Sequence, residues 1–325
     1  MIGLENYLNS LKILVLGGSG QIGSEIRAHQ DEIDFSFSFP SSSELNLKNI
    51  TSIRNYFSAN TFDIVLNLAA YTSVDKAEEE KELSDKINHI GPEILAEETC
   101  KRNIGLIHVS TDYVFGKTGH GPYKSSDIKD PLNHYGHTKS LGEDKVLSIH
   151  DKSIIIRLAS VFGNYGNNFV KTLTTKLLED NDIRLVSDQL ISLSYSNDFV
   201  KNLKEIILLY INHKNNNKIL KSSIIHLTSP DYTNWFSVGS IIYDEIEKFT
   251  QSPLSVRLIP ISSSEWISAA QRPLDTRLKV DYKFLKDNSI RISPWQDSVR
   301  LVVRNTLSSL KGKALWKKQL LTLRE

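Results

Sequence analysis

A glycine-rich segment near the amino terminus constrains the fold of this chain more than any other feature. The apolar run 12–16, KILVL, leads directly into Gly17, Gly20 and Gly23, which follow one another at a three-residue spacing. Glycine in these places permits a tight turn, close approach of a pyrophosphate to the backbone, and close packing of the next helix on the strand. The N–H groups and positive dipole end of that helix then face the phosphates. The segment predicts a dinucleotide-binding turn between a β-strand and an α-helix.

Apolar runs of strand length recur along the chain and alternate with segments of helical spacing. Residues 62–70, 105–115, 153–163 and 224–229 predict strands, and residues 84–103, 234–249 and 294–310 predict helices. Strands that are apolar on both faces and separated by helices indicate a parallel sheet covered on both sides. We therefore expect a doubly wound α/β protein of the Rossmann type with a smaller C-terminal substrate domain.

The expected domain boundaries follow the change in regularity after the first half of the chain. Residues 1–165, with a later return around 195–228, are expected to form the NAD(P)-binding domain, and residues 166–194 and 229–325 the substrate domain. The polar segment 213–218 predicts a loop. The basic segment 311–325 predicts the solvated face of a helix.

Composition excludes several classes of function. The net charge is +1 over 325 residues, so we expect no nucleic-acid partner, and no apolar stretch approaches the length of a membrane helix. Cys100 is the only cysteine, so an intramolecular disulfide is excluded, which fits a reducing compartment. No cluster has metal-site spacing. The expectation is a soluble cytoplasmic protein without a metal, and a homodimer is left open.

A second motif carries reaction chemistry. Tyr135 and Lys139 form a Y-x-x-x-K pair, whose members lie on one face of a helix. A nearby ammonium is expected to lower the pKa of the phenol, which makes Tyr135 a proton donor to a carbonyl, and Lys139 is also expected to hold the nicotinamide ribose. Thr111 follows an apolar strand, where open α/β sheets bind ligands, and is expected to hydrogen-bond the substrate carbonyl.

The cofactor preference depends on the end of the second strand. An acidic residue there accepts a hydrogen bond from the ribose 2′-OH and disfavours a 2′-phosphate. This chain has Ser41, Ser42 and Ser43 near that point, Glu44 slightly later, and no arginine adjacent in sequence. Because the serine hydroxyls can donate to a 2′-phosphate, the sequence favours NADPH and leaves NADH open.

Together these motifs resemble the extended short-chain dehydrogenase/reductases and, among them, the dTDP-4-dehydrorhamnose reductase family. The resemblance covers roughly residues 12–305. It is carried by these stretches: GGSGQIG, AAYTSVDKAE, VSTDYVF, PLNHYGHTK, GNNFVKT, SDQ and QRPLDTRL.

The resemblance implies a set of functional residues. It makes Thr111, Tyr135 and Lys139 the catalytic triad for NAD(P)H-dependent reduction of a 4-keto-6-deoxysugar on a nucleoside diphosphate, most readily a dTDP-sugar for surface polysaccharide. The residues expected to contact the cofactor, besides Tyr135 and Lys139, are Gly17, Gly20, Gln21, Ile22, Gly23, Ser41, Asn46, Leu47, Ala69, Ala70, Tyr71 and Asn88. The residues expected to face the sugar nucleotide are Asp112, Tyr113, Asn167, Asn168 and Arg272.

Three positions depart from the family pattern. Ser160 stands where the family presents a tryptophan to the sugar, and Ser194 stands where a Pro-Thr pair usually ends. Both changes are expected in the substrate pocket, so the hexose and its C4 stereochemistry stay open. Asn46 replaces a frequent Asp near adenine, and its amide oxygen is still an acceptor.

Three other functions are alternatives to the reductase. Sugar-nucleotide dehydratases use an Asp-Glu pair after the threonine, whereas Asp112 is followed here by Tyr113, which favours simple reduction. A non-catalytic regulatory subunit resembling that of methionine adenosyltransferase, and a nucleotide-sugar epimerase that regenerates its own cofactor, remain as alternatives.

Overall fold

A six-stranded parallel sheet forms the centre of the larger part of the molecule. The computed structural model describes residues 10–33, 35–179, 181–216 and 223–311. The strand order is β2-β1-β3-β4-β5-β9, and every pairing is parallel. The strands are β1 (Lys12–Leu16), β2 (Ser36–Ser38), β3 (Ile64–Asn67), β4 (Gly105–Thr111), β5 (Ile154–Leu158) and β9 (Ile224–His226). This confirms the predicted doubly wound sheet.

Both faces of the sheet are buried because neighbouring residues of each strand join different cores. In β1, Ile13 and Val15 pack with one buried cluster, whereas Leu14 and Leu16 pack with the cluster on the opposite face. All four side chains are 3% exposed or less. Strands of a parallel sheet read as continuous apolar runs for this reason, since neither face meets water.

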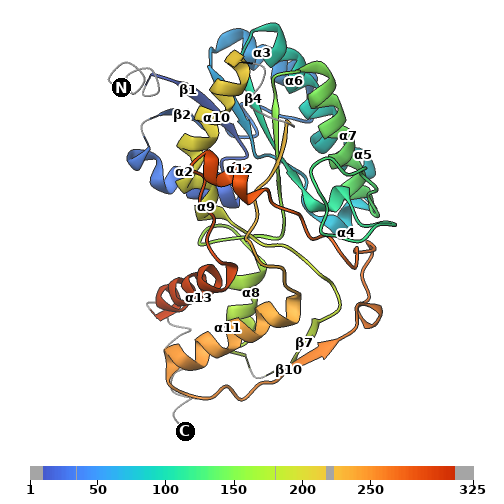
Figure 1. The fold of residues 1–325 in the computed structure, drawn as a ribbon, viewed down its shortest axis with the longest axis vertical. Helices are drawn as coiled ribbons and strands as arrows, with labels where there is room; N and C mark the ends of the chain where they lie inside the picture. Colours follow the sequence, from blue (N-terminus) through green and yellow to red (C-terminus); the bar gives the residue numbers. More distant parts are fainter. Residues whose placement is uncertain (1–9, 34, 180, 217–222, 312–325) are drawn as a thin grey trace.

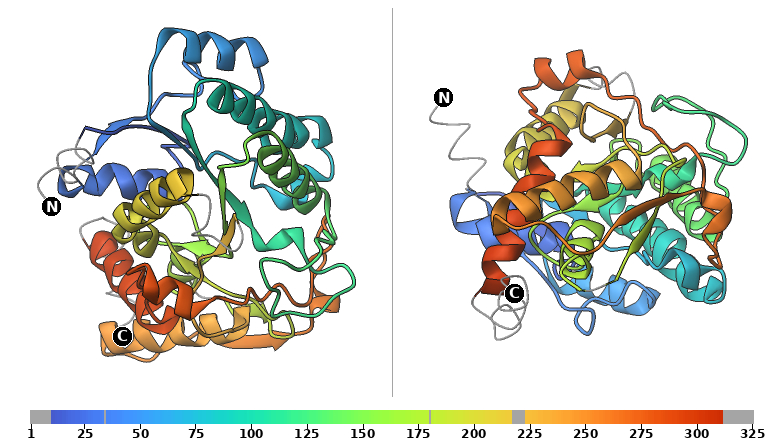
Figure 2. Two further views of the ribbon diagram at one scale, coloured as in Figure 1. Left: turned by 45° about the horizontal axis from the view of Figure 1, so that its top comes forward. Right: turned by 90° about the horizontal axis from the view of Figure 1, so that it is seen from below.

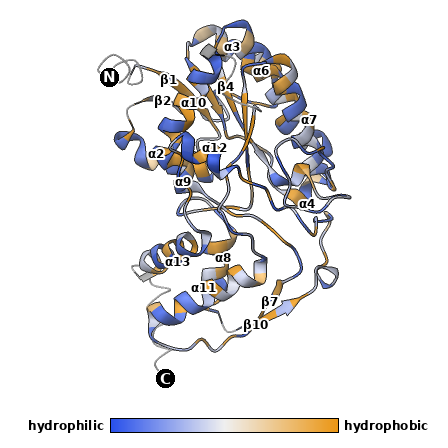
Figure 3. Ribbon diagram, viewed as in Figure 1, coloured by the Kyte–Doolittle hydropathy of each residue, from blue (hydrophilic) through white to orange (hydrophobic). Residues whose placement is uncertain are grey.

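Two layers of helices cover these faces (Figure 1). On one side lie α3 (Ile50–Ala59), α6 (Gly91–Lys101) and α7 (His134–Ile149), and on the other lie α2 (Gln21–His29), α9 (Ser196–Lys201), α10 (Leu203–Asn216) and α12 (Tyr282–Asp287). Hydropathy colouring shows apolar strands between helices whose outer faces are polar (Figure 3). Among the described residues, no helix is long and apolar enough to cross a membrane.

A smaller, separate core lies below the carboxyl ends of the strands in the view of Figure 1. Its helices are α8 (Phe169–Lys176), α11 (Trp235–Thr250) and α13 (Trp295–Lys311), which are also seen from below in Figure 2. Leu173, Ile242 and Val299 are buried together in this core. Two short parallel pairs join it, and they consist of β7 (Ile183–Val186) with β10 (Leu258–Ile261) and β6 (Val161–Phe162) with β8 (Ser194–Tyr195). The smaller C-terminal part is therefore present.

The prediction of a loop over residues 213–218 is wrong for its first four residues. Residues 213–216 form the last turn of α10, and Lys214 Nζ donates to the Asn103 carbonyl at 2.6 Å. Basic residues in a last turn complement the helix dipole, so polar composition did not end the helix there. Residues 217–218 and 312–325, the latter including most of the predicted basic helix, lie outside the described residues.

The order of the strands fixes where ligands meet this sheet. The chain runs from β1 to β2 on one side and then continues through β3 on the other side of β1. The two crossovers diverge at the carboxyl ends of β1 and β3, and such a point is where open α/β sheets bind ligands. The turn after β1 and the segment after β3 therefore meet at the predicted cofactor position.

Candidate active site

The turn after β1 has the geometry that its three glycines predict. Gly17 has φ +80°, and a Cβ on it would lie 2.7 Å from the Ala69 backbone nitrogen. A Cβ on Gly23 would lie 2.4 Å from the Gly17 carbonyl oxygen, so any side chain there would push α2 away from the turn. Gly20 is the N-cap of α2, and no side chain caps this helix end. The N–H groups of the first turn therefore stay available for an anion.

Side chains from α2 and from the end of β2 meet beside this turn. The Arg27 guanidinium lies 4.3 Å from the centre of the Phe39 ring, and its Nε donates to the Gly18 carbonyl at 3.4 Å. Ser41 donates to the Glu44 carboxylate from both its backbone nitrogen and its hydroxyl, each at 2.7 Å. These bonds lower the pKa of Glu44. A cation and a carboxylate thus stand at the predicted adenosine end.

Asn46 and Leu47 continue this region towards α3 and α6. Asn46 Oδ1 accepts from the backbone nitrogen of Lys48 at 3.0 Å, so this acceptor, predicted to face adenine, also closes a local turn. The carbonyl of Leu47 lies 3.0 Å from the place that a Cβ on Gly91 would occupy. Leu47 therefore packs against the start of α6.

The segment after β3 is held by one buried asparagine. Asn88 Oδ1 accepts from the Tyr71 backbone nitrogen at 2.8 Å, and Asn88 Nδ2 donates to the Tyr71 carbonyl at 3.0 Å. The same amide reaches Thr138 Oγ1 of α7 at 3.2 Å. Asn88 lies in a π-helical turn, Lys86–Ile90, and is fully buried. It fixes Ala70 and Tyr71 at the edge of the sheet while also contacting the helix that carries Tyr135.

Helix α7 begins close to the end of β4. Its N-cap is Asn133, whose Oδ1 accepts from the Gly136 nitrogen at 2.9 Å and whose Nδ2 donates to the Gln271 carbonyl at 3.0 Å. A Cβ on Gly136 would lie 2.1 Å from the Tyr113 carbonyl oxygen, so only glycine allows this approach. The close approach places Tyr135 over the carboxyl end of β4.

Thr111, Asp112 and Tyr135 meet at this end of β4. Thr111 Oγ1 donates to Asp112 Oδ1 at 3.0 Å and accepts from the Tyr113 nitrogen at 3.3 Å. Burial raises the pKa of Tyr135 to about 12; a hydrogen bond with Thr111 acts in the opposite direction, and the charge of Asp112 raises the pKa further. Burial likewise raises the pKa of Asp112 to about 6. Tyr135 therefore carries its proton throughout the neutral range.

The expected effect of Lys139 on Tyr135 is not seen. Lys139 Nζ donates to the Val109 carbonyl at 2.8 Å and lies 3.3 Å from His108 Nε2. Burial lowers the pKa of Lys139 to about 8, and the charge of Glu143 opposes that shift. The prediction of a lowered pKa for Tyr135 is wrong because burial outweighs every other influence on the phenol and because the amine is directed towards β4.

Three of the predicted sugar-nucleotide residues lie together. The Tyr113 ring packs edge-on against the Tyr135 ring, with 5.8 Å between their centres. Burial raises the pKa of Tyr113, and the nearby charge of Arg272 opposes this shift. Arg272 makes hydrogen bonds of 2.7 and 3.1 Å to the Asp75 carboxylate of α4 (Val74–Ala77). Asp112 and Tyr113 thus adjoin Tyr135, and Arg272 adjoins Tyr113.

The other two predicted sugar-nucleotide residues lie elsewhere. Asn167 is exposed, whereas Asn168 is buried and caps α8, with its Oδ1 accepting from the Lys171 nitrogen at 3.1 Å. The neighbouring Gly166 packs on Gln21 of the glycine turn. Gln21 Oε1 is buried and has no hydrogen-bond partner. These residues adjoin the predicted pyrophosphate position and lie apart from the Tyr113 ring.

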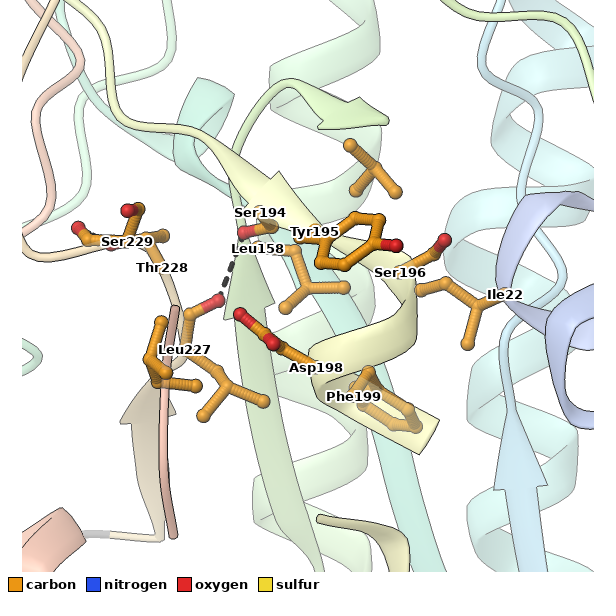
Figure 4. Close-up of a pocket in the computed structure, with 12 residues that line it drawn as sticks. Ile22, Leu158, Ser194, Tyr195, Ser196, Asp198, Phe199, Leu227, Thr228 and Ser229 are labelled. Atoms are coloured by element: carbon orange, nitrogen blue, oxygen red, sulfur yellow. Dashed lines mark hydrogen bonds between the residues drawn. The ribbon is translucent and has the colours of Figure 1, made fainter. Parts of the chain in front are cut away.

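The two serines that depart from the family pattern lie where β5 leads into β6 and at the start of β8. Ser160 has φ +41°, a left-handed backbone at the point where β5 leads into β6. Ser194 Oγ donates to the Leu227 carbonyl at 2.9 Å and accepts from the Ala159 nitrogen at 3.1 Å. Figure 4 shows Ser194 on the wall of a small cavity that Ile22 and Tyr195 also line. Thr111, Tyr135 and Lys139 do not line this cavity.

Two residues of the site, Arg27 and Asp75, were not predicted from the sequence. Arg27 is separated from Phe39 by a helix and a strand, and only the crossover between β1 and β2 brings them together. Asp75 lies within the AAYTSVDKAE stretch, but its partner is 197 residues away. The available signals were an unassigned charge within AAYTSVDKAE and another four residues after GGSGQIG.

Comparison with known proteins agrees with this geometry. The sequence model of the family "RmlD substrate binding domain" matches residues 11–308. The chain is 32% identical over 300 residues to a dTDP-4-dehydrorhamnose reductase of Aggregatibacter actinomycetemcomitans, covering 89% of this chain and 97% of that one. It is 30% identical over 289 residues to the spore coat polysaccharide biosynthesis protein SpsK of Bacillus subtilis strain 168, covering 89% and 95%.

Solved structures give the same result. A dTDP-4-dehydrorhamnose reductase of Bacillus anthracis, determined in complex with NADP, superposes with a TM-score of 0.78 at 26% identity, covering 92% of this chain and 99% of that one. A Yersinia enterocolitica dTDP-4-dehydrorhamnose reductase gives 0.79 at 25% identity, covering 91% and 100%. With the family match over residues 11–308, these likenesses show that the chain belongs to the RmlD substrate binding domain family, the dTDP-4-dehydrorhamnose reductases and their relatives.

Proposed function

We propose that this protein is an NAD(P)H-dependent oxidoreductase that reduces the 4-keto group of a nucleotide-linked 6-deoxyhexose, most readily a dTDP-sugar. One observation carries the proposal. Thr111 and Tyr135 adjoin at the carboxyl end of β4, with Lys139 one helical turn further along α7. When a cofactor supplies the hydride, the protein must position the carbonyl and donate a proton to its oxygen. A hydroxyl, a phenol and an amine in this order can do both.

The residues around the glycine turn fit a dinucleotide. Cβ atoms on Gly17 and Gly23 would clash with the backbone, and the uncapped end of α2 offers its N–H groups to a pyrophosphate. The buried Gln21 Oε1 without a partner is a further acceptor for a bound ligand. The B. anthracis relative was determined with NADP, which supports the same class of cofactor here.

The proposed chemistry uses the three side chains in separate roles. When bound, reduced nicotinamide supplies the hydride that adds to C4. Tyr135 keeps its phenolic proton at neutral pH and donates it to the developing alkoxide. The Thr111 hydroxyl hydrogen-bonds the same oxygen. Lys139, whose pKa burial lowers to about 8, restores the proton of Tyr135 and holds the ribose.

The substrate side of the proposal uses Asp112 and Tyr113, which adjoin Tyr135, and Arg272, which adjoins Tyr113. We assign residues 1–165 and 195–228 to the cofactor domain, and residues 166–194 and 229–325 to the substrate domain. The buried cluster of α8, α11 and α13 supports this division, but α12, which falls within the substrate range, packs through Leu285 on the sheet of the cofactor domain. SpsK and the reductase relatives support a role in making deoxysugars for surface polysaccharide. The homodimer stays a prediction.

The principal test is a Tyr135→Phe variant assayed with dTDP-, GDP-, UDP- and CDP-linked 4-ketosugars by loss of NADPH absorbance. The variant should bind NADPH with unchanged affinity while turnover falls by about 10²–10⁴-fold. Tyr56→Phe on α3 is the matched control, because its ring stacks on Phe62 away from β4. Undiminished turnover in Tyr135→Phe would refute the assignment.

Two alternatives have distinct outcomes in the same experiments. An epimerase would purify with tightly held oxidised cofactor and would not consume NADPH. A regulatory subunit would bind cofactor without turning over any of the four ketosugars and would co-purify with a synthetase.

A further inference from the structure

A buried chain of polar side chains connects the segment after β3 to Lys139. Asn67 Nδ2 lies 2.9 Å from His108 Nδ1, and His108 Nε2 lies 3.3 Å from Lys139 Nζ. Asn67 and His108 are fully buried and Lys139 is 1% exposed. The three residues belong to β3, β4 and α7, so the chain runs beneath the proposed active site. Burying a series of polar side chains at this depth costs free energy unless their hydrogen bonds are satisfied.

The direction of every hydrogen bond in this chain is fixed from one end. The Ala69 backbone N–H can only donate, and its acceptor is Asn67 Oδ1 at 3.2 Å. The amide group therefore turns its Nδ2–H groups towards His108 Nδ1. Burial, and then the charge of Lys139, lower the pKa of His108 well below 6.5, so the ring is neutral and has one proton. Since Nδ1 accepts from Asn67, that proton lies on Nε2.

The Nε2–H bond of His108 consequently faces Lys139. An ammonium group is only a donor, so it cannot accept this hydrogen, whereas a neutral amine offers a lone pair. Lys139 already gives one hydrogen to the Val109 carbonyl at 2.8 Å. We propose that His108 is a positioning residue that favours the neutral form of Lys139 by presenting an N–H, instead of a lone pair, to its nitrogen.

Other charges near Lys139 do not produce this effect. Glu143, on the same helix, raises the pKa of Lys139, whereas burial lowers it to about 8. Glu143 is itself paired with Arg157 of β5 at 2.7 Å and with Lys129 at 3.4 Å. The elements packed against α7 carry further titratable groups. They are Asp75 and Lys76 on α4, Lys81, Glu82 and Asp85 on α5 (Lys81–Asp85), Lys86 and His89 in the π-helical turn, Glu93, Glu97, Glu98, Cys100 and Lys101 on α6, His108 on β4, and Asp112 and Tyr113 in the 3-10 turn Asp112–Val114. Among all of these, His108 is the group whose ring nitrogen faces Nζ.

The consequence for the reaction rests on the proposed function. Tyr135 must regain a proton after each turnover, and a lysine close to its deprotonation point releases one more readily than an ordinary lysine. The hydrogen-bonded series Asn67, His108 and Lys139 also connects Lys139 to the Ala69 backbone, which is expected to line the cofactor. His108 would thus act on the reaction through Lys139 without contacting the substrate.

The tautomer of His108 can be measured without any activity. In protein labelled with ¹⁵N-histidine, long-range ¹H–¹⁵N correlation spectra distinguish a protonated Nε2 from a protonated Nδ1. We expect the His108 signal, assigned as the one lost in His108→Asn, to show a protonated Nε2 from pH 6 to pH 9. In Asn67→Asp a carboxylate faces Nδ1, so the proton should move to Nδ1. A protonated Nδ1 in the unaltered protein would overturn the inference.

The second arm is the pH dependence of kcat/KM for ketosugar reduction. Activity should fall as pH rises through the pKa of Lys139. Asn67→Asp turns a His108 lone pair towards Nζ, and His108→Leu removes the opposing N–H, so both should move this alkaline limb upward by about one pH unit. If His108 were merely structural, its substitution would lower the denaturation midpoint and leave the alkaline limb of kcat/KM in place. That result would contradict the proposal.

The two arms separate this inference from the proposed function. If no ketosugar is reduced, the proposed function fails and the tautomer measurement still decides the role of His108. If reduction is observed but the tautomer is reversed, only the inference fails. His108→Asn serves the kinetic arm should His108→Leu not fold, because it shortens the side chain and keeps a polar group in the buried strand.

Discussion

The guanidinium of Arg272 is bound to the carboxylate of Asp75 by two hydrogen bonds, Nη2 to Oδ2 at 2.7 Å and Nη1 to Oδ1 at 3.1 Å. Asp75 also accepts from the Ala270 nitrogen at 3.0 Å, so it holds both the side chain and the backbone of this segment. Burial alone would raise the pKa of Asp75, but the Arg272 hydrogen bond is the larger effect and the pKa is lowered. The pair fixes Arg272 beside Tyr113.

Loss of this pair should weaken substrate binding and spare the cofactor. In Asp75→Asn the bidentate geometry is lost, and Arg272 must be ordered by the substrate instead. We expect KM for the nucleotide sugar to rise about tenfold, equivalent to ~1.4 kcal/mol, with unchanged NADPH affinity. Glu265→Gln is the control, since it breaks the exposed ion pair of Arg184 in the same half of the molecule. Equal effects of the two variants on KM would contradict this role of Asp75.

Asn88 should contribute strongly to stability. Its amide bonds both backbone groups of Tyr71 and reaches Thr138, so Asn88→Ala leaves buried polar groups unpaired. We expect the free energy of unfolding to fall by about 2–4 kcal/mol, since each buried unsatisfied group costs about 1–3 kcal/mol. Urea denaturation followed by circular dichroism measures this change. Asn167→Ala, at an exposed position, should have almost no effect, and a similar loss in both variants would refute the argument.

The elements that the sequence predicted correctly are those whose signals are local. The run KILVL and the glycines that follow it determine a buried strand, a tight turn and an uncapped helix, and the structure confirms each of them. Helical spacing over residues 84–103 likewise predicted a helix. The π-helical turn within it was not visible, and the bonds that Asn88 makes from this turn join residues distant in sequence.

What sequence could not supply was the environment of each site residue. The spacing of Tyr135 and Lys139 places them on one helical face, but their pKa values depend on burial and on nearby groups, Thr111 and Asp112 for Tyr135 and Glu143 for Lys139. The substrate role that the resemblance gives Asn168 stays a prediction, and its side chain also caps α8. The pKa of Tyr135 was predicted wrongly because it depends on tertiary burial, which no local pattern encodes.

Cofactor preference should depend on two opposing charges beside the end of β2. Arg27 lies on Phe39 next to the glycine turn, where it favours a 2′-phosphate, and Glu44 disfavours one. Arg27→Ala should lower kcat/KM for NADPH about tenfold and leave that for NADH nearly unchanged. Glu44→Gln should instead raise kcat/KM for NADPH relative to that for NADH. Lys48→Ala, which removes an exposed cation from the same loop, is the control. If Arg27→Ala left the ratio of kcat/KM for NADPH and NADH unaltered, Arg27 would not bind the 2′-phosphate.

The buried pair of Glu143 and Arg157 should make stability depend on pH in the acid range. Burial alone would raise the pKa of Glu143, but two hydrogen bonds from Arg157, at 2.7 and 2.8 Å, hold it below the ordinary value of 4.5. A lowered folded-state pKa gives stability that is present above the unfolded value and is lost as pH falls through the folded one. Glu143→Gln leaves the guanidinium buried without its counter-charge, which should cost about 3–5 kcal/mol at pH 7.

The difference in unfolding free energy between the unaltered protein and Glu143→Gln should therefore be large at pH 7 and shrink below about pH 4.5, because protonated Glu143 and glutamine are both neutral. Urea denaturation at several pH values measures it. Asp182→Asn is the matched control, since its pair with Arg257 lies at the surface, where solvent screens it. A difference for Glu143→Gln that stays constant from pH 7 to pH 3 would mean that the carboxylate charge does not stabilise α7 against β5.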